Sequence, residues 1–427
     1  MTKRNLAAPV AMLLSVLTGG LVAQANRVDL EPAWAAWGAG QIDLAQRLGN
    51  EAVAAGRALD EAHHLLCLTA FVTGDYRGSR DHYHAIGSTY RRLAELDDTV
   101  LESHIHLGEL QEALDFAVKR PAVRPLTVRR LEAHARRPLS INLPDLTVVP
   151  FADHPLTDYL PAFNAEINGQ ALTVHLDTGG TYLMMGPARA ASLGITTVKG
   201  GKGEAHLNRT RVDMSHGIAD RLALGQAVLQ NVPVDVVSTL TGDVDLVILG
   251  TNLLEPFLAT LDYPSRRMLL SKRRDPTTRV AHVAMLPAAS VVVPFYLWSD
   301  HFMFARGSLG DRVHLNFFVD SGLVSLHPDG TGGSRQASFT SSEKKFRRWG
   351  IARSDLRRGV FESAAALCLG PLCQQRPLCV VGAAGDTTFG GIRIDGLISH
   401  AFLKRYVWTI DFDARIYQFA EPSFRID

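Results

Sequence analysis

The chain has 427 residues, of which 46% are hydrophobic and 20% are charged. This is too long for one ordinary core and too apolar for a disordered chain, so two or three folded domains are expected. The formal net charge of +1 provides no global field that would attract nucleic acid or an anionic membrane. No basic stripe interleaved with aromatic residues suggests a nucleic-acid groove either.

Residues 1–25 are typical of an export signal. A basic segment, MTKRN, precedes an apolar run that ends on small residues at Ala23 and Ala25. We expect cleavage after Ala25 and a mature protein in the periplasm or outside the cell. The alternative is an uncleaved membrane anchor, which Pro9 and Gly19 disfavour because they weaken a continuous apolar span.

Residues 26–120 are predicted to form a helical domain. A glycine followed by a small residue five positions later recurs at intervals of 34 residues, as Gly40 with Ala45, Gly74 with Ser79, and Gly108 with Ala113. This is the period of a helix-turn-helix repeat in which small residues let paired helices approach closely. The pattern resembles the tetratricopeptide repeat family, which implies a surface for a protein partner or substrate. A plain antiparallel helical bundle is the alternative, and the histidines of this segment are interpreted as surface or groove residues rather than metal ligands.

Residues 121–142 are interpreted as a basic linker. The run KRPAVRPLTVRRLEAHARR carries one acid, and its prolines interrupt helix. A run of like charges is usually solvated. An acidic partner for this segment remains open.

Three cysteines near the C-terminal end are candidates for a disulfide. An exported chain meets an oxidising compartment, so we expect one disulfide among Cys368, Cys373 and Cys379. Which pair is bonded depends on geometry that the sequence does not give. No histidine stands beside them at ligand spacing, so a zinc site is not expected. We expect no metal and no organic cofactor.

From residue 143 onward, short β-type runs separated by turn residues predict an all-β region. The sequence of this region contains an internal duplication. The segment LTVHLDTGG around Asp177 has a counterpart in LNFFVDSGL around Asp320, 143 residues later. LALGQAVLQNVPVDVV is matched by LCLGPLCQQRPLCVV, and VILGTNLLEPFLATLDYPSRRMLL by GLISHAFLKRYVWTIDFDARIYQF. The blocks keep the same order, so we expect two related β lobes at residues 143–275 and 276–427.

The paired Asp-hydroxyl-Gly loops resemble the retropepsin-like aspartyl protease family, here with two lobes fused in a pepsin-like arrangement. The resemblance covers roughly residues 143–425 and implies that Asp177 and Asp320 face each other across a cleft as the catalytic pair. It also implies that four neighbouring residues brace the two loops: Thr178, Gly179, Ser321 and Gly322. A fused pair of lobes does not need dimerisation to assemble its site, so a monomer is expected.

Two carboxylates at the spacing implied by this resemblance would share one proton. At about 3 Å and an effective dielectric near 20, their mutual repulsion is on the order of 5 kcal/mol, so both do not ionise together. The ionised acid can take a proton from water while the protonated acid donates to a peptide carbonyl. The expected activity is therefore that of an exported aspartic endopeptidase acting on peptide or protein substrates.

The two halves differ in ways that bear on function. Gly194 and Gly225 enclose a longer segment than their counterparts Gly350 and Gly370, which leaves room in the first lobe for one long hairpin. A single mobile flap over the substrate is implied, with Gly200, Gly201 and Gly203 as flap candidates.

A second difference is Ser399, which stands where the first lobe keeps Gly250. A relaxed second loop would leave a catalytically inactive pseudoprotease or a peptide-binding scaffold. This is the alternative function that the sequence leaves open.

Overall fold

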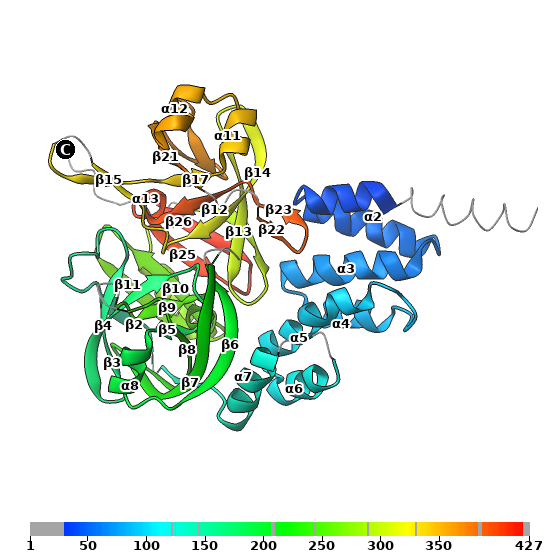
Figure 1. The fold of residues 1–427 in the computed structure, drawn as a ribbon, viewed down its shortest axis with the longest axis horizontal. Helices are drawn as coiled ribbons and strands as arrows, with labels where there is room; N and C mark the ends of the chain where they lie inside the picture. Colours follow the sequence, from blue (N-terminus) through cyan, green and yellow to red (C-terminus); the bar gives the residue numbers. More distant parts are fainter. Residues whose placement is uncertain are drawn as a thin grey trace, which may run out of the picture.

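The computed structural model describes residues 30–120, 123, 125–143, 145–205, 210–241, 245–287, 290–328, 331–382 and 387–421. A helical region lies along one side of two β-rich units, one above the other in Figure 1. Within the described ranges, no helix combines the length and apolar character that crossing a bilayer requires. The expected signal segment, residues 1–25, lies outside the described residues.

The helical region begins with a helix over residues 30–38 and continues as α2 (Ile42–Ala54), α3 (Leu59–Thr73), α4 (Tyr76–His84), the 3-10 turn η1 (Leu93–Leu96), α5 (Asp97–His106), α6 (Leu110–Val118) and α7 (Pro125–Arg136). The recurring glycines each lie between two helices in the left-handed region, at φ values of 70°, 88° and 76° for Gly40, Gly74 and Gly108. A side chain is strained in this conformation, which explains the glycines. The small residues that follow, Ala45, Ser79 and Ala113, are fully buried between helices.

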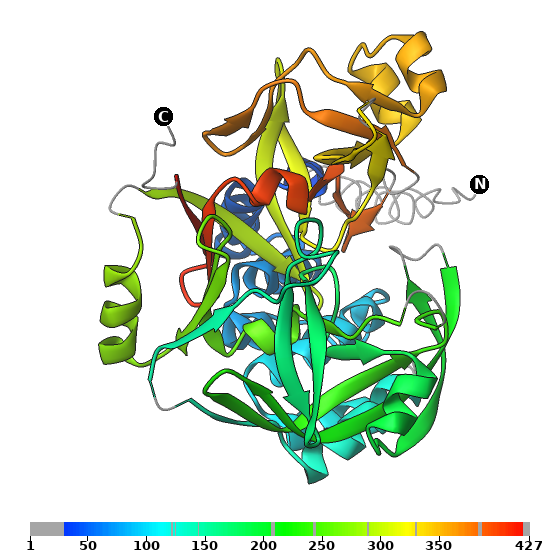
Figure 2. The same cartoon turned by 90° about the vertical axis from the view of Figure 1, so that its left-hand side faces the viewer.

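The helical region shares a hydrophobic core with the second β unit. Apolar side chains of the first helices pack with the following β residues: Phe304, Phe318, Phe389, Ile392, Ile394 and Leu397. The Trp37 indole Nε1–H donates to Gly390 O at 2.8 Å, and Phe71 meets Trp298 edge to face. In Figure 2 the helices lie behind the β units, on the side away from the viewer. Because these contacts are buried and apolar, the helices and the β unit stabilise each other.

The segment interpreted as a solvated linker differs from that expectation. Residues 125–136 form α7, in which Leu131 and His134 are buried. Helix α7 packs against strands β6 (Thr197–Ala205) and β7 (Thr210–Leu224), and Arg129 Nη1 donates to Lys199 O at 2.8 Å. The basic run therefore connects the helical region to the first β unit through a packed helix rather than through a free chain.

The first β unit is an eight-stranded sheet in the order β1-β8-β5-β9-β4-β3-β7-β6. Its remaining elements are β1 (Ser140–Asn142), β3 (Ala162–Ile167), β4 (Gln170–Asp177), β5 (Leu183–Met185), α8 (Pro187–Ser192), β8 (Ala227–Val237), β9 (Ile248–Gly250) and α9 (Thr251–Leu254). Hairpin β3–β4 leads directly to Asp177, and β4 runs parallel to β9.

The second β unit repeats this plan. Hairpin β13 (Phe302–Leu309) and β14 (Arg312–Asp320) leads to Asp320, and β14 runs parallel to β24 (Gly396–Ser399). The surrounding elements are β15 (Leu326–Pro328), β16 (Ser334–Gln336), β17 (Phe339–Ser341), α11 (Glu343–Arg348), α12 (Arg353–Arg358), β18 (Val360–Glu362), β19 (Leu367–Leu369), β20 (Leu372–Gln374), β21 (Leu378–Val381), β22 (Thr388–Phe389), β23 (Ile392–Arg393) and α13 (His400–Leu403).

A shared sheet joins the two units. Its strands are β12 (Ser290–Trp298), β26 (Ile416–Ala420), β25 (Val407–Asp411), β10 (Phe257–Asp262), β11 (Arg267–Lys272) and β2 (Thr147–Pro150), with helix α10 (Pro276–Ala284) beside β11. Strands β10 and β25, one from each half, pair antiparallel, and Thr260 lies opposite Thr409 with their hydroxyl oxygens 2.6 Å apart. The matched sequence blocks therefore meet each other at the centre of the molecule.

Candidate active site

Asp177 and Asp320 each end the second strand of a hairpin and lie at corresponding positions. Asp177 is in register with Gly250 across the parallel pair β4–β9, and Asp320 is in register with Ser399 across β14–β24. The two carboxyl groups approach the same point, because a Cβ on Gly179 would lie 2.8 Å from Asp320 Oδ1 and 3.1 Å from Asp177 Oδ1. Both residues are partly accessible.

The residues that follow the two acids bind the loops to each other. Thr178 N–H donates to Ser321 Oγ at 3.0 Å, and Ser321 N–H donates to Thr178 Oγ1 at 3.0 Å. The Thr178 hydroxyl also donates to Val319 O at 3.1 Å. Both hydroxyl residues are fully buried, so these bonds fix the separation of the two loops.

The glycines of the two loops leave room for the acids of the opposite loops. A Cβ atom on Gly322 would lie 2.0 Å from Cγ of Asp177, and one on Gly179 would lie 2.8 Å from Oδ1 of Asp320. Each glycine also supports its own acid, because Gly179 N–H donates to Asp177 Oδ1 at 2.7 Å and Gly322 N–H to Asp320 Oδ1 at 3.0 Å. These positions need glycine for a close approach between loops.

The surroundings of the two acids favour one shared proton. Burial and the neighbouring charge of Asp177 raise the pKa of Asp320 well above its ordinary value. Burial also raises the pKa of Asp177, but the Gly179 N–H, the Asp320 carboxyl and the charge of His301 act in the opposite direction. These influences favour a pair that keeps a single proton, held more readily by Asp320 than by Asp177.

His301 and its neighbour Asp300 lie in the turn between β12 and β13. His301 Nδ1 is 2.6 Å from Asp300 Oδ1, and Arg130 of α7 approaches Asp300 Oδ2 at 3.6 Å. Although burial opposes ionisation, His301 and Arg130 hold the pKa of Asp300 well below its ordinary range. Asp300, which Arg130 of the helical region helps to keep ionised, therefore holds the His301 ring, and the protonated form of this ring acts on Asp177.

Asp300 and His301 are not among the site residues predicted from the sequence, although the sequence carries a signal for them. An Asp-His dipeptide precedes the Asp-hydroxyl-Gly loop in both halves, as Asp153–His154 and Asp300–His301. The first copy takes a different place, because His154 Nδ1 lies 3.4 Å from Nε2 of the buried His175. The repeat could have marked His301 as a candidate, but its position beside the acids depends on tertiary packing.

Replacing Arg130 should destabilise the junction between the helical region and the β units. Arg130→Gln would leave Asp300 and Glu102 facing each other, and burial together with Asp300 already raises the pKa of Glu102 strongly. We expect the free energy of unfolding to fall by about 2–3 kcal/mol, measured by urea denaturation. The neighbouring Arg129→Gln, which removes an exposed bond to the backbone, should cost less than about 1 kcal/mol. Equal effects of the two substitutions would contradict this role of Arg130.

Residues 163–253 match the family model for aspartyl proteases. The match includes the loop of Asp177, strand β9 and the hairpin of β6 and β7, so the first β unit carries an aspartyl-protease-like domain. No curated protein matches the chain.

Solved structures that are similar to the chain include aspartic and retropepsin-like proteases. The aspartic proteinase from Irpex lacteus is 12% identical, with a TM-score of 0.39 over 66% of this chain and 98% of that chain. A retropepsin-like aspartic protease from Rickettsia conorii is 17% identical, with a TM-score of 0.24 over 31% of this chain and 93% of its own. Conglutin gamma, a basic 7S globulin from lupine seeds, is 10% identical, with a TM-score of 0.40 over 66% and 96%.

Ser399, the departure from the glycine of the aspartyl-protease-like first unit, has its own local arrangement. A Cβ on Gly250 would lie 1.8 Å from Thr181 O. At the corresponding place in the second unit, the Ser399 hydroxyl donates to Ala337 O and accepts from Ala401 N–H at 3.1 Å. In the first unit, the carbonyl of Thr181 would clash with a side chain at position 250. In the second unit, the corresponding carbonyl of Ala337 accepts a hydrogen bond from the Ser399 side chain. The second unit therefore accommodates the Ser399 side chain, which also caps the N-terminus of α13.

Substitutions at these two positions should have very different costs. Ser399→Ala removes a cap and a buried hydrogen bond, so we expect about 1–2 kcal/mol of lost stability. Gly250→Ala forces a side chain onto backbone atoms and should cost more than about 3 kcal/mol or prevent folding. Thermal denaturation of both variants checks this order, which a harmless Gly250→Ala would contradict.

The flap candidates lie on the hairpin of β6 and β7, whose strands pair over residues 197–205 and 210–217. Gly201 has a φ of 139°, and the register shifts between Lys199 and Gly201, as at a β-bulge. Gly203 faces Met214, because a Cβ there would lie 1.9 Å from the Met214 sulfur. Gly200 belongs to the same strand, and helix α7 holds the adjacent Lys199 carbonyl. The bulge therefore lies between the part of the hairpin that α7 contacts at Lys199 and the outer part of the hairpin.

The three C-terminal cysteines do not share one role. Cys368 and Cys373 form a disulfide across the β19–β20 hairpin, where they lie directly opposite each other. Cys379 is buried and unbonded, and burial raises its thiol pKa to about 12, so its thiol stays protonated. The pairing register of β19 and β20, which sequence spacing does not reveal, places these two cysteines together.

Proposed function

We propose that the chain is an aspartic endopeptidase in which Asp177 and Asp320 activate a water molecule against a peptide bond. The observation that carries the proposal is the reciprocal pair of hydrogen bonds between Thr178 and Ser321, which supports a shared site built from both halves. The match of residues 163–253 to aspartyl proteases supports the same assignment. The two β units act as the lobes of a fused, retropepsin-like enzyme.

In the proposed reaction, ionised Asp177 removes a proton from the water as its oxygen attacks the scissile carbonyl carbon. Protonated Asp320 donates its proton to the carbonyl oxygen, so a neutral tetrahedral diol forms. The proton on Asp177 then passes to the peptide nitrogen, a diol proton returns to Asp320, and the C–N bond breaks. The products are a carboxyl group and an amine, and the pair regains its starting single proton.

We further propose that the chain is exported with its N-terminal segment cleaved. The Cys368–Cys373 disulfide suits an oxidising compartment. The hairpin of β6 and β7 acts as the flap. The helical repeats are tetratricopeptide-like and present substrate or a protein partner to the cleft, and the fused chain acts as a monomer.

Incubation of the purified mature chain with an unfolded protein at mildly acidic pH tests this function. Mass spectrometry should find new peptide termini, and in 18O-labelled water each new carboxyl group should carry one labelled oxygen from the attacking water. Absence of cleavage across a broad range of pH and substrates would favour the alternative, a peptide-binding scaffold.

A further inference from the structure

A cavity of about 700 Å³ lies between the helical region and the first β unit, apart from the paired acids. Its walls come from the α5–α6 turn, the end of α7 and the segments that follow β9 and β11. This volume is within the range of pockets that bind small organic ligands.

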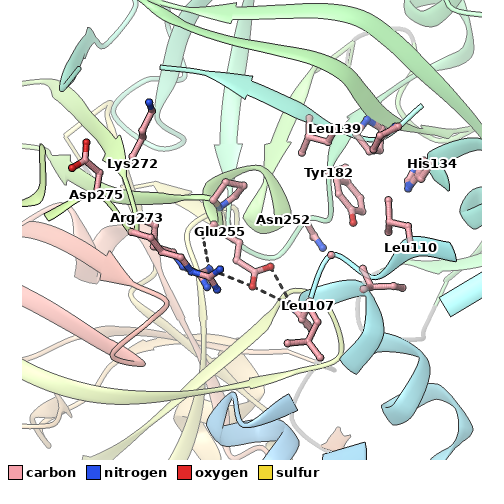
Figure 3. A pocket seen from close by; sticks show the side chains of 17 residues that line it. Leu107, Leu110, His134, Leu139, Tyr182, Asn252, Glu255, Lys272, Arg273 and Asp275 are labelled. Carbon is pink, nitrogen blue, oxygen red and sulfur yellow. Dashed lines mark hydrogen bonds and ion pairs between the residues drawn. The ribbon is translucent and has the colours of Figure 1, made fainter. Parts of the chain in front are cut away.

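The chemistry of the lining changes from one end to the other. In Figure 3, Lys272 and Arg273 lie at one end, while Leu110, Leu139 and Tyr182 lie at the other. Glu255 and Asn252 lie between these ends. A ligand that fills the cavity would therefore meet a cationic end and an apolar end.

The two acidic residues of the lining, Glu255 and Asp275, already have partners within the protein. Glu255 Oε1 lies 3.1 Å from His106 Nδ1 and 3.6 Å from Arg273 Nη1. Although burial opposes ionisation, His106 and Arg273 hold the pKa of Glu255 down to about 2. Asp275 accepts from Thr277 N–H at 3.0 Å and caps α10.

Two exposed cations, Lys272 and Arg274, lie at the same end of the cavity. The Lys272 ammonium has no ion pair among the described residues, and Lys272 is exposed. The Arg274 side chain is 79% exposed and approaches Asp413 at a distance of 3.7 Å. The ammonium of Lys272 and the exposed guanidinium of Arg274, whose ion pair is with Asp413, therefore present positively charged groups at this end of the cavity.

The middle of the cavity holds an unsatisfied polar group. Asn252 is 6% exposed, and its Oδ1 has no hydrogen-bond partner in the described part of the chain. Its backbone N–H donates to Thr181 O at 3.3 Å, and Gly250 N–H donates to Tyr182 O at 2.7 Å. The wall of the cavity thus includes the segment that directly follows Asp177.

We propose that this cavity binds a chain that is apolar along its length and ends in a carboxylate, with the carboxylate at Lys272 and Arg274. The apolar part lies against Leu110, Leu139 and Tyr182. A peptide with an apolar free C-terminus and a medium-chain fatty acid share this chemistry. The site is separate from the proposed peptidase reaction and does not depend on it.

Calorimetric titration of the full-length mature Asp177→Asn variant tests the proposal without interference from cleavage. The probes are decanoate, decanol, the acetylated peptide Leu-Ala-Leu-Leu with a free carboxylate, and the same peptide as its C-terminal amide. At least one acid should bind with one-to-one stoichiometry and at least tenfold more tightly than its neutral counterpart. Saturation by the peptide or by decanoate identifies the source of the ligand.

Two further variants locate the binding. Lys272→Ala/Arg274→Ala should raise the Kd of the bound acid at least tenfold, and Leu110→Trp, which fills the apolar end, should abolish binding. The matched variant Arg91→Ala/Lys119→Ala loses the same charge from exposed positions of the helical region and should leave the Kd unchanged. Failure of both acids to saturate, equal affinity for acid and neutral probes, or an unchanged Kd in Lys272→Ala/Arg274→Ala would overturn the proposal.

Discussion

Asp177→Asn and Asp320→Asn should each lower kcat/KM for peptide hydrolysis by about 10³-fold or more. Each substitution removes one partner of the general acid and base pair, a type of catalysis worth about 10²–10⁴-fold, and the remaining acid lacks a second group with which to share a proton. Because the two residues act as a unit, the double variant should be no slower than the slower single variant. Steady-state kinetics on one peptide substrate measure all three.

Stability measurements separate this effect from misfolding. The raised pKa of Asp320 means that its contribution to stability is present below the ordinary aspartate pKa and is lost as pH rises through the folded value. Asparagine avoids that loss, so Asp320→Asn should unfold at a higher temperature than wild type near pH 7, and the difference should vanish near pH 3. Asp311→Asn, an exposed position on the hairpin before Asp320, is the matched control and should change neither activity nor stability. Full activity in either variant of the pair would exclude a shared site.

Gly322→Ala should abolish most of the activity while both acids remain in the chain. The new methyl group would lie 2.0 Å from the Asp177 carboxyl carbon, so Asp177 or the second loop must move. A displacement of about 1 Å in a catalytic group can cost about 10²-fold in rate, and overpacking costs about 1–3 kcal/mol in stability.

The same reasoning predicts a graded series. Gly179→Ala meets Asp320 Oδ1 at 2.8 Å, a milder contact, so it should retain more activity than Gly322→Ala. Gly38→Ala, whose new Cβ would have its nearest contact at 3.8 Å, is the control and should be neutral. Kinetics together with chemical denaturation measure the series. Unchanged activity in Gly322→Ala would show that the loops are farther apart than the structure places them.

Much of the β architecture could be inferred from the sequence because it is encoded twice. The matched segments around Asp177 and Asp320 adopt the same hairpin and the same parallel pairing, and the matched blocks containing Thr260 and Thr409 meet in the shared sheet. The 34-residue spacing likewise indicated the turns that need glycine, since the backbone at Gly40 adopts positive φ. Such local requirements leave a trace in the sequence.

Features that depend on distant partners left no such trace. The basic run around Arg130 was interpreted as solvated because its partners Asp300 and Asp235 lie more than 100 residues away in the chain. Ser399 was a source of doubt because the sequence does not show that the carbonyl of Ala337 accepts its hydroxyl. The packing of the helices on Phe304, Phe318 and Phe389 is also invisible in a pattern that records only one strand at a time.

The pH dependence of kcat/KM for the wild-type chain tests most directly whether the two halves share one proton. A shared proton predicts a bell-shaped profile, because activity is lost at low pH when both carboxyl groups are protonated and at high pH when both are ionised. The high-pH limb should lie above the ordinary range of aspartate, since burial and the charge of Asp177 raise the pKa of Asp320. A rate that keeps rising into alkaline pH, or that follows a single ionisation, would contradict a proton shared by Asp177 and Asp320.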